Sequence, residues 1–130
     1  MSYVLDSSAI FKAIRTGAVE ALAGNYTLEL ARYELGNILW KEHNLHKRIN
    51  IEELKQLILL IKRALNLMEF MGLECREEKV LSVAERLKVT FYDASYIVCA
   101  QEKGIPLTTE DENLISKAGN YIKVARLNVP

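Results

Sequence analysis

Four acidic residues stand at or near the ends of segments whose patterns predict strands or helices. They are Asp6, Glu34, Asp93 and Asp111. Asp6 directly follows the apolar run at residues 3–5, and Asp111 lies just past a second apolar run at residues 105–108. Because ligands gather at the carboxyl ends of strands in a parallel sheet, we expect the four side chains to line one crevice.

Carboxylates gathered in one crevice repel one another, and something must offset that repulsion. Two unit charges about 4 Å apart cost about 4 kcal/mol at an effective dielectric constant of ~20. Protonation of one carboxyl group is one answer. A divalent cation is the other, and sites built from oxygen ligands suit Mg²⁺ or Mn²⁺. Such a cation activates water and stabilises a leaving oxygen, which is the chemistry of phosphodiester hydrolysis with one or two metals.

Each acidic residue also has a purely structural interpretation. Asp93 lies in the first turn of the predicted helix at residues 90–104, where the helix dipole favours a carboxylate. Glu34 by itself is typical of a solvated helix residue. Asp6 is the strongest functional candidate, because it follows a buried strand directly.

Asp111 is crowded by other acids. Glu110 and Glu112 flank it, and Thr109 with Glu112 has the spacing of a helix capping box. The sequence therefore leaves open whether Glu110 or Glu112 takes the place of Asp111.

The elements that would position these residues alternate along the chain. Apolar, β-branched and alternating runs predict strands at residues 3–5, 26–30, 105–108 and 121–127. Helical periodicity predicts helices at residues 9–15, 19–23, 31–42, 51–71, 77–87, 90–104 and 109–118. This alternation indicates the α/β class, with a parallel sheet covered on both faces.

Several local features follow from these patterns. Ser7 or Ser8 is the expected N-cap of the first helix. Asn37 shares a face with Glu34, whereas Trp40 is placed on the core side. The helix at residues 51–71 is apolar nearly all round in its middle, which indicates either deep burial or association.

Composition narrows the class of protein. The chain has 130 residues, which predicts a single domain over residues 1–130, and its net charge is zero. Any site for a polyanion must therefore be a local patch. Cys75 and Cys99 are expected to be reduced and buried in a cytoplasmic protein. We expect neither a secretory leader nor a membrane span.

The residues also carry a family resemblance, which runs nearly end to end. The matching pieces are VLDSSAI (residues 4–10), YELGNILWK (33–41), FYDASYIVCAQEKG (91–104) and PLTTEDENL (106–114). With these motifs in this order, the chain resembles the PIN domain family and, within it, the VapC-type toxins of prokaryotic toxin–antitoxin pairs. Residues 43–86 match the family only in their helical character and carry no motif of it.

The resemblance implies an α/β/α fold around a parallel sheet and an endoribonuclease that depends on Mg²⁺ or Mn²⁺. It makes Asp6 and Asp93 the primary metal-binding pair. Glu34 would complete the acidic pocket, and Asp111 corresponds to the family's fourth acid. Asn37 is a plausible polar helper.

The resemblance also implies partners. Such toxins act on RNA as homodimers and are silenced by a small VapB-type antitoxin that inserts a C-terminal segment near the acidic pocket. The alternatives are an RNA-processing nuclease of the same family outside toxin–antitoxin pairs, and a module that binds RNA or a partner with little catalysis.

The basic stretch at residues 41–48 has two interpretations. It contains Lys41, His43, His46, Lys47 and Arg48. Basic side chains of this kind contact RNA phosphates, but they are equally typical of a solvated loop. Trp40 and the tyrosines are candidates for base stacking.

Overall fold

A five-stranded parallel sheet lies at the centre of the structure. The computed structural model describes residues 2–128. The strands are β1 (Val4–Leu5), β2 (Tyr26–Leu28), β3 (Glu69–Met71), β4 (Leu107–Thr108) and β5 (Val124–Ala125). Their order across the sheet is β3-β2-β1-β4-β5, and all four pairings are parallel. The predicted α/β class with a parallel sheet is confirmed.

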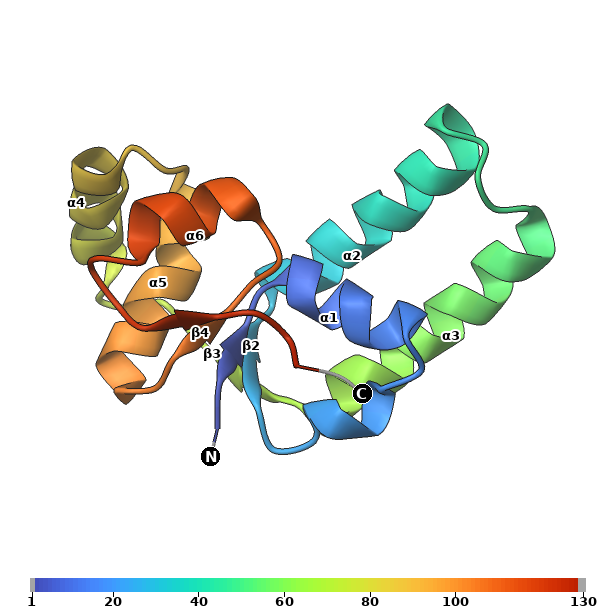
Figure 1. Ribbon diagram of the computed structural model, residues 1–130, viewed down its shortest axis with the longest axis horizontal. Coiled ribbons are helices and arrows are strands. Elements are labelled where there is room, and N and C mark those ends of the chain that lie inside the picture. Colours follow the sequence, from blue (N-terminus) through green and yellow to red (C-terminus); the bar gives the residue numbers. More distant parts are fainter. Residues whose placement is uncertain (1, 129–130) are drawn as a thin grey trace.

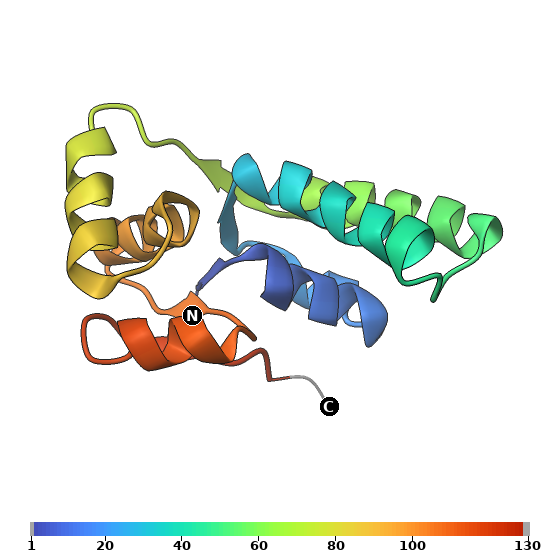
Figure 2. The same cartoon turned by 90° about the horizontal axis from the view of Figure 1, so that it is seen from above.

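Helices cover both faces of this sheet. The α-helices are α1 (Ser7–Arg15), α2 (Leu30–Trp40), α3 (Ile51–Leu67), α4 (Glu77–Leu87), α5 (Phe91–Lys103) and α6 (Glu112–Ala118). A 3-10 turn, η1 (Val19–Leu22), follows α1, and a π-helical turn, η2 (Lys41–Leu45), extends α2. Figures 1 and 2 show α1, α2 and α3 on one side of the strands and α4, α5 and α6 on the other.

The two faces bury separate apolar clusters, because neighbouring strand residues point to opposite sides. In β1, Val4 packs into the cluster formed with α4, α5 and α6, whereas Leu5 packs into the cluster formed with α1, α2 and α3. Both side chains are almost fully buried. The two-residue strand therefore anchors both layers and fixes where the next residue, Asp6, must lie.

One predicted helix was too long. The sequence predicted a helix over residues 51–71, but α3 ends at Leu67 and Glu69–Met71 forms β3. Met68 is already extended, with φ −103° and ψ 158°. The exposed edge of β2 offers unpaired backbone groups, and pairing Tyr26 with Glu69 satisfies them. Pairing with a distant strand thus overrides the helical pattern of this segment.

Some burial predictions were also wrong. Trp40 is 51 % exposed rather than in the core, because it lies outside the stripe of α2 that buries Leu35 and Leu39. Cys75 is exposed, while Cys99 is buried, and both thiols are free. Within residues 2–128, no helix combines the length and apolar character needed to cross a bilayer.

Candidate functional site

The acidic residues lie where the strand order reverses. From β1 the chain builds outward to β2 and β3, and it then returns to the other side of β1 to form β4 and β5. In open parallel sheets, the crevice at such a switch point is the usual ligand site. Asp6 follows β1 directly, and Asp111 lies three residues beyond the end of β4.

Asp6 is buried, with a relative exposure of 5 %, and its carboxylate accepts three hydrogen bonds. Oδ1 accepts from the Ala9 amide at 3.0 Å and from the Ser8 hydroxyl at 2.7 Å, while Oδ2 accepts from the Thr109 hydroxyl. The bond from Ala9 makes Asp6 the N-cap of α1, so the predicted caps Ser7 and Ser8 were wrong. Burial raises the pKa of Asp6, and these hydrogen bonds oppose the rise.

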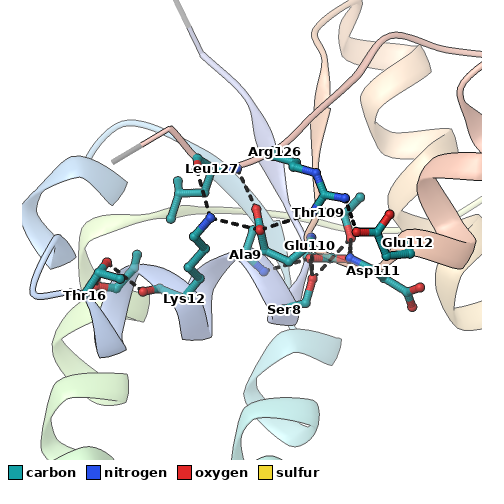
Figure 3. Close-up of polar contacts among 12 residues, drawn as sticks. Ser8, Ala9, Lys12, Thr16, Thr109, Glu110, Asp111, Glu112, Arg126 and Leu127 are labelled. Atoms are coloured by element: carbon teal, nitrogen blue, oxygen red, sulfur yellow. Dashed lines mark hydrogen bonds and ion pairs between the residues drawn. The ribbon is translucent and has the colours of Figure 1, made fainter. Parts of the chain in front are cut away.

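Two hydroxyl groups connect Asp6 to the turn that carries Asp111. The Ser8 hydroxyl accepts from the Glu110 amide at 2.9 Å, and the Thr109 hydroxyl accepts from the Asp111 amide at 3.1 Å. Each hydroxyl thus accepts one backbone N–H and donates its hydrogen to Asp6. Figure 3 shows Ser8 and Thr109 side by side between α1 and this turn. The network fixes the β4–α6 turn against the buried carboxylate.

The two acids that flank Asp111 are engaged elsewhere. Glu110 accepts from the Lys12 ammonium at 3.0 Å and from the Leu127 amide at 2.7 Å, so it joins α1 to the segment after β5 (Figure 3). Burial opposes ionisation of Glu110, but these contacts lower its pKa overall. Glu112 forms an ion pair with Arg126.

Asp111 is exposed, and it has a structural role of its own. Its Oδ1 accepts from the Asn113 amide at 2.9 Å and the Leu114 amide at 3.2 Å. Asp111 is therefore the N-cap of α6, and the predicted capping box of Thr109 and Glu112 was wrong.

Asp93 occupies the first turn of α5, as predicted, but Thr90 rather than an acid caps that helix. The Thr90 hydroxyl accepts from the Asp93 amide at 3.0 Å. Partial burial and, after it, the charges of Asp111, Asp6 and Glu34 together raise the pKa of Asp93 from 3.8 to about 6. Three carboxylates contributed by other elements therefore act on Asp93 together.

Glu34 is held by a buried tyrosine. The Tyr96 hydroxyl donates to Oε1 of Glu34 at 2.6 Å, and Tyr96 is only 1 % exposed. Burial raises the pKa of Tyr96, and the bonded Glu34 raises it further, so the phenol keeps its proton. Tyr96 lies one turn after Asp93 on α5, which joins the α2 and α5 acids into one assembly.

The donor set fits a hard divalent cation in its chemistry. All four side chains carry carboxylate oxygens, and a cation would relieve the part of the rise in the pKa of Asp93 that follows burial in size and comes from Asp111, Asp6 and Glu34. In the arrangement seen for residues 2–128, no three Asp, Glu, His or Cys side chains converge closely enough to hold an ion. Mg²⁺ is commonly held by one or two carboxylates, with waters and substrate phosphates as its other ligands.

Sequence reasoning missed three residues of this site: Ser8, Thr109 and Tyr96. Tyr96 had a usable signal, because it follows Asp93 by three positions on a predicted helix. Ser8 and Thr109 had none, since they lie 101 positions apart and meet only through the sheet.

Asn37 and the basic stretch at residues 41–48 lie outside the hydrogen-bonded network around Asp6. Asn37 is exposed on α2 beside Glu34. The basic stretch forms the tip of the α2–α3 hairpin, far from the sheet in Figures 1 and 2. There, His43 contacts the Ile49 carbonyl through Nδ1 at 2.9 Å, and Arg48 pairs with Glu42.

Comparisons with known proteins agree on one family. The family model described as "PIN domain" matches residues 3–120. Two relatives come from Pyrobaculum aerophilum. One is named exonuclease VapC9, with 31 % identity over 140 aligned positions, covering 99 % of this chain and 95 % of the relative. The other is named ribonuclease VapC3, with 35 % identity over 135 positions, covering 90 % of this chain and 95 % of the relative.

A solved structure has the same fold. It is the crystal structure of PAE2754 from Pyrobaculum aerophilum, with a TM-score of 0.78 and 26 % sequence identity. The match covers 97 % of this chain and 89 % of the other.

Proposed function

The chain belongs to the PIN domain family and is of the VapC type, and on this premise we propose that it is an endoribonuclease dependent on Mg²⁺ or Mn²⁺. The observation that carries the proposal is the position of the acids at the switch point of the sheet: Asp6 directly follows β1, and Asp93 lies near enough to Asp111, Asp6 and Glu34 for their charges to raise its pKa. Two relatives with nuclease names support hydrolysis of a nucleic acid.

In this proposal Asp6 and Asp93 hold the cation, and Glu34 and Asp111 support it directly or through water. Asp6 is the rigid ligand, because Ser8 and Thr109 fix both of its oxygens. The cation, when bound, supplies an activated water and positive charge for the leaving oxygen.

The remaining polar groups orient the acids. Tyr96 keeps Glu34 turned toward α5 through its hydrogen bond. Asp111 supports the site rather than Glu110 or Glu112, because those two are tied to Lys12 and Arg126. The charge of Asp111 is the largest electrostatic influence on Asp93.

The biological role that we propose is that of a toxin. Residues 1–130 form a single domain that acts in the cytoplasm as a homodimer and is silenced by a small VapB-type antitoxin. Names of the VapC type among the relatives support this role. A small open reading frame directly upstream of the gene is the observation to seek, and its absence would favour an RNA-processing nuclease instead.

Substitution of the acids tests the reaction. We expect Asp6→Asn and Asp93→Asn each to lower the rate of RNA cleavage by about a hundredfold or more, since both remove a charged oxygen ligand. The matched control is Glu112→Gln, which changes an acid one residue from Asp111 but paired with Arg126. Folding is checked by circular dichroism. Full activity of either Asn variant, or activity that persists in EDTA, would refute the proposal.

Whether the enzyme cuts within an RNA or from its ends needs its own experiment, because one relative is named an exonuclease. A circular RNA has no ends, so only an endonuclease can linearise it. We expect this protein with Mg²⁺ or Mn²⁺ to open circular RNA, and the Asp93→Asn variant to leave it intact. Cleavage of linear RNA alone would assign an exonuclease instead.

A further inference from the structure

Beside the acidic site, two exposed tyrosines line one hollow on the surface. Tyr33 from α2 is 71 % exposed, and Tyr92 from the first turn of α5 is 59 % exposed. The hollow has a volume of about 350 Å³ and is completed by Leu30, Glu34 and Asn37. Single exposed aromatic residues need no explanation, but two from different helices that share one hollow do.

We propose that this hollow is a subsite for one nucleobase of single-stranded RNA, next to the phosphate to be cleaved. The inference rests on the proposed function for the position of that phosphate, because Glu34 belongs to both the hollow and the acidic site. Tyrosine rings stack on bases of any sequence, which suits an aromatic hollow beside a hydrolytic centre.

The polar lining matches the edge of a base. Asn37 carries both a donor and an acceptor, and Glu34 has two acceptor oxygens, of which Tyr96 uses Oε1. Tyr33 and Asn37 are four positions apart on α2, and Glu34 and Asn37 are three apart, so the three side chains share one face. A base whose flat surfaces contact the tyrosines would thus meet hydrogen-bonding groups along its edge.

Charge decides which part of the RNA enters. The hollow itself contains a carboxylate and no Lys or Arg, so a phosphate would be repelled while an uncharged base would not. A second hollow shares Leu30 and Tyr92 and continues toward Gly72 and Leu73, beyond β2 and β3. Glu29 and Glu74 also line this second hollow, so the same charge argument gives it to a further base of the RNA and not to the phosphates.

Fluorescence of a base analogue tests the subsite without catalysis. The probe is a short oligouridylate with one internal 2-aminopurine, titrated with protein in EDTA. Stacking quenches 2-aminopurine, so the wild-type protein should quench it. Tyr33→Ala and Tyr92→Ala should weaken binding by about 5- to 150-fold, the range for loss of one stacked base. Tyr33→Phe and Tyr92→Phe should retain binding, because phenylalanine also stacks.

A matched control and the opposing outcomes complete the test. Phe70→Ala removes another exposed aromatic side chain, on β3, that does not line the hollow, and it should leave binding unchanged. Unaltered affinity in both alanine variants, or no quenching by the wild type, would overturn the subsite. Either result is what we would expect if the hollow instead holds a segment of a protein partner. Quenching without RNA cleavage in Mg²⁺ would overturn the nuclease proposal alone.

Discussion

At the scale of single residues, ionised Asp93 lowers the stability of the folded protein. Its pKa in the folded protein is about 6, raised from 3.8 first by burial and then by the charges of Asp111, Asp6 and Glu34. The folded state therefore binds this proton more tightly than the unfolded chain does. By linkage, the contribution of Asp93 to the stability of the metal-free protein falls as the pH rises from about 4 through about 6.

Asp93→Asn removes that titration. In EDTA at pH 7, we expect the Asn variant to melt a few degrees above the wild type, because it relieves the repulsion at the site. The difference should vanish below about pH 4, where the wild-type carboxyl group is protonated in both states. Adding Mg²⁺ should raise the melting temperature of the wild type more than that of the variant. Thermal melts across pH measure all three effects. They would be contradicted if the melting temperature of the variant, relative to that of the wild type, were lower at pH 7 than at pH 4.

At the scale of elements, the turn between β4 and α6 depends on the buried Thr109 hydroxyl. This hydroxyl donates to Asp6 and accepts from the Asp111 amide. Thr109→Val keeps the shape but leaves a partly buried N–H of Asp111 and a buried carboxylate oxygen of Asp6 without their partner, so we expect a loss of about 1–3 kcal/mol in the free energy of unfolding. Urea denaturation measures it.

The control for this change is Thr16→Val. The Thr16 hydroxyl donates to the Lys12 carbonyl at 2.8 Å, at the exposed end of α1. Water replaces that bond, and the expected change stays within about 0.5 kcal/mol. Equal losses in the two variants would show that the hydroxyl network around Asp6 adds nothing beyond a surface bond.

The elements also show what the sequence can predict. Residues 77–87 and 91–103 form helices as their sequences indicate. The first buries one apolar stripe, Val80, Val83 and Ala84, whereas the second is buried on all sides over Ala94–Ala100. The spacing of Asp6 from a buried run likewise predicts its position correctly, since β1 packs into both layers.

The predictions that were wrong, and the residues that were missed, depend on contacts between distant segments. Nothing local distinguishes residues 69–71 from the helix before them, and only pairing with β2 makes them a strand. Ser8 and Thr109 meet only because β1 and β4 are neighbours. Trp40 was misplaced because the sequence alone does not show which side of α2 the core covers: Leu35 and Leu39 are buried, and Trp40 lies outside their stripe.

At the scale of the whole molecule, α3 carries exposed leucines that the proposed homodimer would bury. One side of the helix packs Ile61, Ala64 and Leu65 into the core. The outer side presents Leu59 and Leu60, which are 63 % and 37 % exposed, along a hollow of about 780 Å³. Burial of one such side chain contributes about 1.5–3 kcal/mol, and a twofold interface uses each residue twice.

We therefore expect the protein to sediment as a dimer and Leu59→Lys to shift it to a monomer, because the charge would be buried without a partner at the interface. Leu81→Lys is the matched control, since Leu81 on α4 is 62 % exposed and lies on the opposite layer of the sheet. Sedimentation velocity over a range of concentrations distinguishes the two variants. A monomeric wild type, or a Leu59→Lys variant that remains dimeric, would exclude α3 as the dimer surface. Circular dichroism of both variants separates loss of association from loss of folding.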